Sequence, residues 1–307
     1  MPPSLIAIDW GSSSFRAYLL DRDGEIMDEI ASANGVAAVA KGAFPATLVS
    51  LTGGWMAAHP ALPIIASGMV GSRNGWIEAP YVKCPAGATE ICANLATVEA
   101  GGRVVHIAPG LACEDEAGLP DVMRGEEVEI IGIADRGARL VVLPGSHSKW
   151  AVIDEGRVKR FRTFVTGELF SAINDHTLIG AFARAAKPRP PGPAFSLAVQ
   201  RGAAAARGGE DRPGLLSALF GARSLPLMNR LAEDDAGEYL SGLLIGAEIA
   251  EARRLFPGEE PFVAGVETLV QRYLAAFAAL GVPARAAPAK AAARGLYLMA
   301  RAGGLVA

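Results

Sequence analysis

The chain has 307 residues, of which 51% are hydrophobic and 20% are charged, and this length suits about two domains of ordinary size. A hydrophobic fraction this large supplies a sizeable core and excludes global disorder. The formal charge of −3, with a sequence pI near 5.9, lacks the basic excess that is typical of nucleic-acid binders.

The N-terminal segment predicts a three-stranded ribbon. Residues 4–10 read SLIAIDW and end at the small residues GSSS. FRAYLLD at 15–21 and EIMDEI at 25–30 follow, separated by an Asp-Gly turn, as in strands joined by tight turns. The rest of this half mixes helices with strands. Helices are expected at 44–58 and 122–135, and strands at 63–66 and 103–108.

A second ribbon, with the same order of strands and turn residues, starts at residue 139. It reads RLVVLP, GSHS, KWAVID, EG and RVKRFRTF. Gly11 corresponds to Gly145 and Asp21 to Asp154, so the register slips by one residue along the unit. Two copies of one unit would show such a small slip, whereas two unrelated hairpins would share only their general appearance. We therefore predict that the ribbon is duplicated.

The remainder of the second half is mainly helical. A Pro-rich stretch at 187–193 is expected to form a surface turn, and PFVAG at 261–265 a buried strand that meets a turn. Gly242 and Gly246, on a long expected helix, indicate close packing against another helix, and Gly295 in the last helix is the expected matching partner. Strands in both halves with helices between them predict two α/β domains. The expected helices lie at 168–185, 194–206, 212–221, 234–255, 266–280 and 289–302.

Several common site motifs are absent from the sequence. No lysine follows a glycine, so there is no P-loop, and no two glycines lie two positions apart, which excludes the dinucleotide fingerprint and the protein-kinase glycine loop. Cys84, Cys92 and Cys113 fit neither a disulfide framework nor a zinc ribbon and favour a reducing compartment. With no basic stretch before the first apolar run and no run of ~18 apolar residues, we expect neither a signal peptide nor a membrane span, and a cytoplasmic location.

The turns of the ribbons resemble a known phosphate-binding arrangement. The first turn, from Asp9 to Ser14, is similar to the phosphate clamp of the actin–hexokinase superfamily, in which two such hairpin turns face each other. With further segments in the same order, over about 4–300, the chain resembles the 2-dehydro-3-deoxygalactonokinase family. Those segments are 67–76 (SGMVGSRNGW), 78–87 (EAPYVKCPAG), 121–127 (DVMRGEE), 143–150 (LPGSHSKW), 166–170 (TGELF) and 241–249 (SGLLIGAEI).

The resemblance implies an α/β fold of two ribonuclease-H-like domains that flank an interdomain cleft. Residues 1–136 would form a substrate domain, onto which a C-terminal helix at about 287–307 packs, and residues 137–286 would form the ATP-binding domain. The implied enzyme uses ATP and Mg²⁺ to phosphorylate the 6-hydroxyl of 2-dehydro-3-deoxy-D-galactonate, giving 2-dehydro-3-deoxy-6-phosphogalactonate and ADP in galactonate and galactose catabolism.

Two alternatives to this activity remain. One is a kinase of the same fold that acts on another sugar or sugar acid, such as 2-dehydro-3-deoxygluconate. The other is a non-enzymatic nucleotide-binding regulator. In each case the expected partners are small molecules, with neither nucleic acid nor membrane, and a homo-oligomer is left open.

Two carboxylates are the expected catalytic residues. Asp9 ends an apolar strand, where an anion can hold Mg²⁺ beneath the β- and γ-phosphates, although a turn-forming Asp would look the same. Some relatives in the superfamily carry a catalytic Asp in the second turn, but residues 144–149 contain no acid, so the base must lie elsewhere. Glu126, at the start of an expected helix, is the preferred base, with Glu127 and Asp121 as fallbacks. The helix dipole alone also favours acids there.

The carboxylate of the implied substrate calls for an arginine or a helix N-terminus. Arg73 is the first choice, while Lys83 is an alternative that more simply reads as a surface charge. Thr166 and Glu168 could reach the substrate or cap a helix. The expected substrate contacts are Ser14, Arg16, Arg73, Asn74, Arg124, Thr166 and Glu168.

The turns expose backbone N–H groups and hydroxyls, and such a concave row binds phosphate oxygens, although Ser-rich turns also occur without a ligand. Lys149 could bring positive charge near the phosphates or point outward as a solvated strand residue. The resemblance places a glycine loop, at Gly265, near the adenine, where the backbone could approach a flat ring. The expected ATP and phosphate contacts are Gly11, Ser12, Ser13, Gly145, Ser146, His147, Ser148, Lys149 and Gly265.

Overall fold

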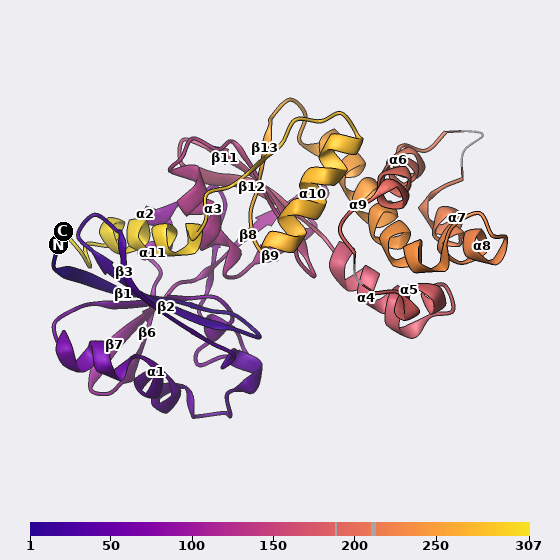
Figure 1. Cartoon of the computed structure of the whole chain (residues 1–307). Coiled ribbons are helices and arrows are strands. Elements are labelled where there is room, and N and C mark those ends of the chain that lie inside the picture. Colours follow the sequence, from indigo (N-terminus) through magenta and orange to yellow (C-terminus); the bar gives the residue numbers. More distant parts are fainter. Residues whose placement is uncertain (188, 210–212) are drawn as a thin grey trace. The chain divides into compact units, whose positions relative to one another are not determined.

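The computed structural model describes residues 1–187, 189–209 and 213–307, and the chain divides into two compact units (Figure 1). The C-terminal segment belongs to the first unit, together with the first 138 residues of the chain. Unit 1 comprises Met1–Ala138, Ala151–Phe161 and Pro288–Ala307, and unit 2 comprises Arg139–Trp150 and Arg162–Ala287.

The outer half of the second ribbon, residues 151–161, differs from the prediction, which assigned it to the second domain. It joins unit 1 through contacts with residues distant in sequence. Ala86 and Val158 exchange backbone hydrogen bonds of 3.1 and 2.8 Å, and Cys113 Sγ donates to the Phe161 carbonyl at 3.3 Å. Such pairings leave no periodic signal in the sequence. The division of the chain into a substrate domain and an ATP domain stays a prediction.

Unit 1 is built on a six-stranded sheet with the order β3-β2-β1-β4-β7-β6. The first three strands form the predicted ribbon and pair antiparallel, whereas β4 pairs parallel with β1 and with β7. Residues 5–8 of β1 are completely buried, as is typical of a central strand with a parallel neighbour. The strands are β1 (Pro3–Trp10), β2 (Phe15–Asp21), β3 (Ile26–Ser32), β4 (Ile64–Ser67), β6 (Ala96–Ala100) and β7 (Arg103–Ile107).

A second sheet of unit 1, with the order β5-β8-β9, was not predicted from the sequence. The strand β9 (Pro120–Met123) pairs antiparallel with β8 (Gly110–Glu114), and β5 (Tyr81–Lys83) lies on the other side of β8. The helix predicted at 122–135 therefore begins only at Glu126, as α3 (Glu126–Ala134). Strands this short are difficult to recognise because they show too few alternations.

Helices α3 and α11 of unit 1 pack closely through glycines. A Cβ at Gly132 would lie 2.9 Å from the carbonyl carbon of Ala291, and one at Gly295 would lie 2.8 Å from that of Val128. Gly295 therefore makes a close helix contact, but with α3 and not with the helix that carries Gly242 and Gly246, so its expected pairing with that helix is wrong. Helix α11 comprises Ala291–Ala302. The other helices of unit 1 are α1 (Phe44–Ala58) and α2 (Ala88–Cys92), with 3₁₀ turns η1 (Val36–Ala38) and η2 (Met69–Gly71).

A five-stranded sheet has the order β12-β11-β10-β13-β14, of which unit 2 holds β10, β13, β14 and one end each of β11 and β12. β13 pairs parallel with β10 and with β14. Counted along the chain, both sheets place their third, second and first strands side by side, followed by two parallel strands, as the repeated ribbon predicts. The strands are β10 (Leu140–Leu143), β11 (Ser148–Asp154), β12 (Arg157–Phe164), β13 (Pro261–Val263) and β14 (Arg285–Ala286).

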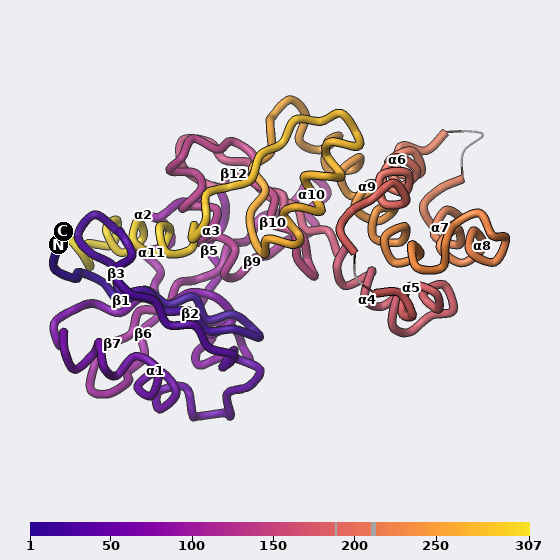
Figure 2. The backbone as a smooth tube through the Cα atoms, viewed as in Figure 1, coloured from indigo at the N-terminus to yellow at the C-terminus, as the bar shows by residue number. Residues whose placement is uncertain are grey.

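Helices α6 and α9 of unit 2 lie side by side (Figure 2). A Cβ at Gly242 would lie 2.5 Å from the Phe195 carbonyl oxygen, and one at Gly246 would lie 2.8 Å from the carbonyl carbon of Val199, which confirms the predicted close packing. The helices are α4 (Thr166–His176), α5 (Ala181–Ala185), α6 (Pro193–Arg207), α7 (Leu215–Leu219), α8 (Gly221–Leu227), η3 (Glu233–Asp235), α9 (Ala236–Leu255) and α10 (Glu267–Ala279).

Two predicted helices of unit 2 are divided. The helix expected at 168–185 splits into α4 and α5, because Thr177 leaves the helix and Gly180 turns the chain against Asn174. The helix expected at 212–221 is replaced by α7 and α8, and its residue 212 lies outside the described part of the chain, as does residue 188 of the expected Pro-rich turn.

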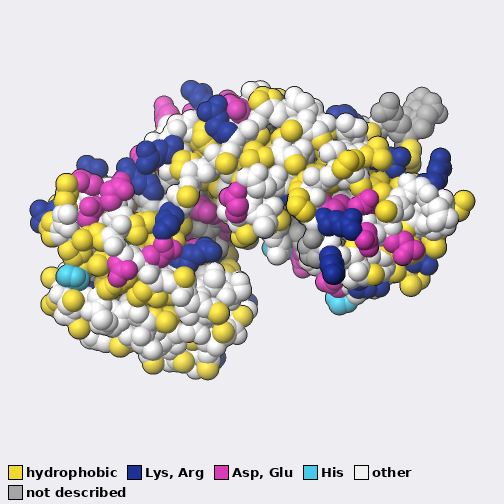
Figure 3. Space-filling model, in the orientation of Figure 1, with side chains coloured by type: hydrophobic (Ala, Val, Ile, Leu, Met, Phe, Trp, Pro, Cys, Tyr) yellow, Lys and Arg dark blue, Asp and Glu magenta, His cyan; other side chains and the backbone are white. Residues whose placement is uncertain are grey.

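Basic and acidic side chains are interspersed on the face of the molecule seen in Figure 3. Of the helices in the described ranges, none combines the length and apolar character that crossing a bilayer requires.

Candidate functional site

Backbone hydrogen bonds from the segment that follows β3 hold the first turn, Gly11–Ser14, in place. The Gly11 N–H donates to the Ser14 carbonyl at 2.9 Å, and the Gly11 and Ser12 carbonyls each accept a backbone N–H from η1 at 3.0 Å. A Cβ at Gly35 would overlap Ser12 and Ser13, so this glycine allows the segment to support the turn closely. The supported turn leaves Ser12 and Ser13 exposed at its tip.

Asp9 lies at the end of β1, in register with Arg16 of β2 and Ser67 of β4. Its neighbour Trp10 is fully buried and donates its indole N–H to the Asn34 carbonyl at 2.8 Å, which anchors the strand end. The Arg16 Nη1 lies 3.8 Å from Asp9 Oδ2. Burial raises the pKa of Asp9, Arg16 opposes the rise, and the negative charge of Glu126 adds to it.

Two glycines bring Glu126 toward Asp9. Gly68, with φ +97°, has no room for a Cβ, which would lie 2.6 Å from the Trp10 carbonyl oxygen. Gly125, with φ +105°, packs on Gly68 in turn, and its own Cβ would lie 3.1 Å from the Gly68 Cα. The end of β1, the end of β4 and the start of α3 are therefore stacked, which agrees with the electrostatic influence of Glu126 on Asp9.

Two neighbouring acids in the first turn of α3, Glu126 and Glu127, differ in their surroundings. Glu126 is half-buried, and its Oε2 accepts the Arg124 backbone N–H at 2.9 Å. Glu127 is completely buried, its Oε2 accepts the Gly125 N–H at 2.7 Å, and burial raises its pKa to about 8. A carboxyl enclosed in this way does not meet a substrate, so the accessible acid of the pair is Glu126.

Glu129 also belongs to this group of carboxylates, and the sequence reasoning missed it. Its pKa is raised to about 7, chiefly by burial and also by the charges of Asp9 and Glu126, against the opposing charge of Arg16. Glu129 follows Glu126 by three positions, so the two side chains share one face of α3. That spacing is the signal that could have identified Glu129 from the sequence.

The candidate arginines of unit 1 differ in their surroundings. Arg73 is an exposed residue whose Nε lies 3.6 Å from Glu78 Oε2, and its neighbour Asn74 is exposed as well. Arg124 is only 9% exposed, donates from Nη2 to the Ala79 carbonyl at 2.8 Å and lies over the Tyr81 ring at 4.3 Å. Lys83 lies on the surface, with its Nζ 3.6 Å from Glu114 Oε1, which agrees with its interpretation as a surface charge.

The second turn lies against the start of α4 in unit 2. The Glu168 N–H donates to the Ser146 carbonyl at 2.9 Å, and its Oε2 lies 2.6 Å from His147 Nε2. A Cβ at Gly167 would lie 2.9 Å from both the carbonyl carbon of Gly145 and the Cα of Ser146. The TGELF segment thus supports the second turn, much as η1 supports the first.

Two polar residues of the second turn point inward. Lys149 is 5% exposed, and its Nζ donates to Thr163 Oγ1 at 2.8 Å. The alternative in which Lys149 points outward as a solvated strand residue is therefore wrong, because the side chain is buried and bonded to Thr163 of the neighbouring strand β12. Ser148 is completely buried, and its Oγ lies 2.9 Å from Tyr273 Oη.

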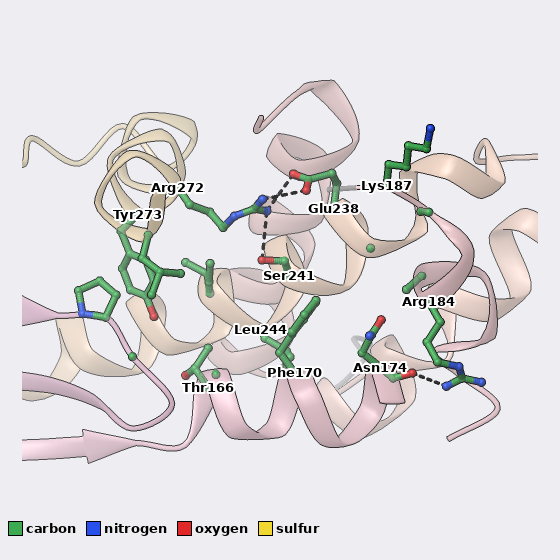
Figure 4. Close-up of a pocket in the computed structure, with 18 of the residues that line it drawn as sticks. Thr166, Phe170, Asn174, Arg184, Lys187, Glu238, Ser241, Leu244, Arg272 and Tyr273 are labelled. Atoms are coloured by element: carbon green, nitrogen blue, oxygen red, sulfur yellow. Dashed lines mark hydrogen bonds and ion pairs between the residues drawn. The ribbon is translucent and has the colours of Figure 1, made fainter. Parts of the chain in front are cut away.

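A cavity of about 350 Å³ adjoins the second turn within unit 2 (Figure 4). Pro144, Gly145 and the first residues of α4 form one wall, and α9 and α10 form another. The Arg272 guanidinium holds the Glu238 carboxylate with two hydrogen bonds of 2.9 Å and reaches Ser241 Oγ at 3.3 Å. Further lining residues are Thr166, Phe170, Asn174, Arg184, Lys187, Leu244 and Tyr273.

Gly265 lies near this wall without lining the cavity. It has φ +118°, which glycine adopts readily, and a Cβ there would lie 3.6 Å from the Pro144 carbonyl oxygen. The neighbouring Ala264 N–H donates to the Val142 carbonyl at 2.9 Å, which fixes the loop after β13 beside the second turn. The sequence reasoning found this loop but missed the helical walls, whose residues are scattered along α4, α5, α9 and α10.

The comparisons with known proteins agree on one family. The family model for 2-keto-3-deoxy-galactonokinase matches residues 9–299. The chain is 36% identical over 288 residues to the 2-dehydro-3-deoxygalactonokinase of Escherichia coli (strain K12), covering 92% of this chain and 91% of that protein. It is 41% identical over 254 residues to the probable 2-dehydro-3-deoxygalactonokinase DgoK1 of Rhizobium meliloti (strain 1021), covering 80% and 79%.

A solved structure gives the same result. The crystal structure of a Sinorhizobium meliloti protein, described as a 2-dehydro-3-deoxygalactonokinase, superposes with a TM-score of 0.86 at 38% identity, covering 97% of this chain and 98% of that one. Together with the strand order shared by both sheets, this likeness identifies the α/β fold of the actin/hexokinase type that the sequence predicted. Because the family model spans nearly the whole sequence, the chain belongs to the 2-keto-3-deoxy-galactonokinase family.

Proposed function

We propose that this protein is a sugar-acid kinase that transfers the γ-phosphoryl group of ATP to the 6-hydroxyl of 2-dehydro-3-deoxy-D-galactonate. The products are 2-dehydro-3-deoxy-6-phosphogalactonate and ADP. The observation that carries the proposal is the 36% identity to the Escherichia coli 2-dehydro-3-deoxygalactonokinase along 92% of this chain. A place in galactonate and galactose catabolism, and a cytoplasmic location, belong to the same proposal.

Glu126 is the proposed general base. Its carboxylate would accept the proton of the 6-hydroxyl while that oxygen bonds to phosphorus and the bond to the ADP oxygen breaks. Positioned bases contribute about 10²–10⁴ to such rates. The hydrogen bond from the Arg124 N–H, at 2.9 Å, orients the Glu126 carboxylate. The enclosure of Glu127 favours Glu126 over that fallback, and Asp121 stays an alternative.

Mg²⁺ is part of the proposal, and the acids of unit 1 suit it. Mg²⁺ prefers carboxylate, phosphate and water oxygens, and usually takes only one or two carboxylates from the protein. Asp9, whose pKa the charge of Glu126 helps to raise, would gain from a nearby cation. Across the described ranges no group of three or more His, Cys, Asp or Glu could hold a metal, which agrees with an ion that shares its ligands with ATP. When bound, the ion would neutralise charge on the phosphates.

Unit 2 is the proposed site for ATP. The second turn consists of small residues with backbone N–H groups, and the 11-residue helix α4 begins beside it, where the helix dipole favours phosphate oxygens. The adjoining cavity of about 350 Å³ is within the range that small-molecule ligands occupy. Gly145, Ser146 and His147 would contact the phosphates through their backbone N–H groups. Phosphate contacts from Gly11, Ser12 and Ser13 of the first turn are also part of the proposal.

The carboxylate of the sugar acid needs a cationic partner, for which Arg73, Arg16 and Arg124 remain the candidates. Arg73 is exposed, and its Nε lies 3.6 Å from Glu78 Oε2 in a surface pair that a substrate carboxylate could replace at little cost. Glu168 contacts the second turn through His147, so its proposed role shifts from the sugar acid to supporting that turn. Thr166 lines the adjoining cavity of unit 2, so its proposed role shifts from the sugar acid to that cavity.

ATP consumption with a panel of acceptors tests the proposal. The purified enzyme would be assayed with 2-dehydro-3-deoxygalactonate, 2-dehydro-3-deoxygluconate, galactonate and glucose at equal concentrations. We expect the highest kcat/KM for 2-dehydro-3-deoxygalactonate. A higher value for 2-dehydro-3-deoxygluconate would favour the same-fold alternative, and preferred turnover of glucose would contradict the proposed substrate class.

A further inference from the structure

Glu248 is a buried acid of unit 2 that the proposed chemistry does not use. It lies on α9 and is only 4% exposed. Its Oε1 accepts the indole N–H of Trp150 at 2.7 Å, and its Oε2 accepts the hydroxyl of Tyr273 at 2.6 Å. These two short hydrogen bonds stabilise the buried carboxylate, since burying an acid without such partners is costly.

The donors to Glu248 come from the elements that form the proposed nucleotide site. Trp150 lies on β11, just after the second turn, Thr166 is the first residue of α4, and Tyr273 lies on α10. Thr166 and Tyr273 also line the cavity, as Figure 4 shows. One carboxylate therefore connects the second turn, the start of α4 and the wall formed by α10.

This network unites three segments that carried the family resemblance. Trp150 lies in 143–150, Thr166 in 166–170 and Glu248 in 241–249, far apart in the sequence. The Thr166 and Ser148 hydroxyls hydrogen-bond the same carboxylate, along with Trp150 and Tyr273. Burial raises the pKa of Glu248, and all of these hydrogen bonds oppose the rise.

The direction of these hydrogen bonds follows from the donors. Trp150 can only donate, and the Tyr273 proton goes to Glu248 Oε2, so the single Ser148 proton is the one left for either the Tyr273 oxygen, at 2.9 Å, or the Glu248 carboxylate. The Ser148 hydroxyl thus donates toward the interior, whether to Tyr273 or to Glu248. The network therefore fixes the strand end of the second turn and leaves phosphate binding there to backbone groups.

We propose that Glu248 is a positioning residue for ATP binding, because its carboxylate holds Thr166 and Tyr273 in the wall of the cavity and ties both to the second turn. This inference rests on the proposed function in one respect, that unit 2 binds the nucleotide. It does not depend on which sugar acid accepts the phosphoryl group.

The test compares Glu248→Gln with the wild-type enzyme in calorimetric titrations with MgATP, without any acceptor. Glutamine keeps the shape but turns one oxygen into an NH₂ group that faces the Trp150 N–H or the Tyr273 hydroxyl. We expect the Kd for MgATP to rise at least about tenfold, because a buried donor loses its acceptor. In steady-state assays the KM for ATP should rise, while the KM for the sugar acid changes by less than about twofold.

A second pair of variants keeps the test decisive if Glu248→Gln does not fold. Tyr273→Phe removes one donor and should raise the Kd for MgATP by about three- to tenfold. Tyr239→Phe is the matched control, since Tyr239 is equally buried but lies on α9 with its hydroxyl bonded to Arg201 at 3.1 Å, outside the network. Its Kd should stay unchanged.

Two results would overturn the inference. One is a lower melting temperature of Glu248→Gln with an unaltered Kd for MgATP, which a merely structural role would give. The other is an equal loss of MgATP affinity in Tyr273→Phe and Tyr239→Phe. Wild-type enzyme that fails to bind MgATP would contradict both the inference and the proposed donor, whereas a wrong acceptor would affect only the panel assay.

Discussion

Gly167 of α4 lies directly against Gly145 of the second turn. A Cβ at Gly167 would lie 2.9 Å from the carbonyl carbon of Gly145 and equally close to the Cα of Ser146. Both neighbours are backbone atoms, which cannot rotate away as a side chain would. The contact explains why a glycine follows Thr166 in the TGELF segment, and it makes the position of the turn depend on this helix.

Gly167→Ala should therefore displace the second turn. Overpacking of this kind costs about 1–3 kcal/mol, and we expect the KM for ATP to rise at least about tenfold with a lower melting temperature. Steady-state kinetics and thermal unfolding measure both effects. Gly54→Ala is the matched control, because a Cβ there meets no atom within 4 Å among the described residues and the helix gains a better helix former. An unchanged KM for ATP in Gly167→Ala would contradict the role given to the turn.

Glu126→Gln should remove the proposed base while preserving the fold. Glutamine can still accept the Arg124 N–H, but it cannot take a proton, so kcat should fall at least about 100-fold. The exposed Glu116 of the same unit provides the control Glu116→Gln, which should retain the wild-type rate. Steady-state rates decide the matter. If Glu126→Gln kept a near-normal kcat, the base would have to be sought at Asp121 or Glu129.

Asp9→Asn should weaken the use of Mg²⁺. The amide keeps the size of the side chain but loses the charge that would attract the cation, so the Mg²⁺ concentration for half-maximal rate should rise at least about tenfold. Titration of the rate with Mg²⁺ at saturating ATP measures this. Asp23→Asn, at an exposed position beyond β2, should behave as wild type. Identical Mg²⁺ curves for Asp9→Asn and wild type would argue against the metal role of Asp9.

The buried Glu127 should make stability depend on pH. Its pKa is raised from 4.5 to about 8, so the folded protein holds the proton more tightly than the unfolded chain does. This carboxyl therefore favours folding most at a pH below 4.5, and its contribution declines as the pH rises from 4.5 through about 8.

Glu127→Gln cannot ionise and should lack that decline. The melting temperature of the variant, relative to wild type, should be higher at about pH 8.5 than at about pH 5. Thermal unfolding followed by circular dichroism at both pH values provides the comparison. A difference that is the same at both pH values would show that Glu127 does not ionise within this window.

The ribbons were predictable because their signals are local. An apolar run that ends at small residues marks both β1 and β10, and the spacing of Gly11 and Gly145 indicated the shared strand order. Gly242, Gly246 and Gly295 likewise marked the close helix pairs, since a missing side chain is visible in the sequence.

The features that escaped prediction depend on contacts between distant segments. The strand β9 exists because it pairs with β8, and residues 151–161 join unit 1 through Ala86. The direction of the Lys149 side chain depends on Thr163 of the neighbouring strand β12, to which its Nζ donates. The cavity walls and the Glu248 network are formed by helices that many residues separate in the sequence, so no single motif indicates them.

The central claim is that this enzyme places a phosphoryl group on the terminal hydroxyl of 2-dehydro-3-deoxygalactonate. Phosphorus–carbon correlated NMR of the product formed from ATP and the carbon-13-labelled acid tests it most directly. We expect one phosphoester, coupled to C6, in amounts equal to the ADP formed. A phosphoester at another carbon, or ADP accompanied only by inorganic phosphate, would contradict it.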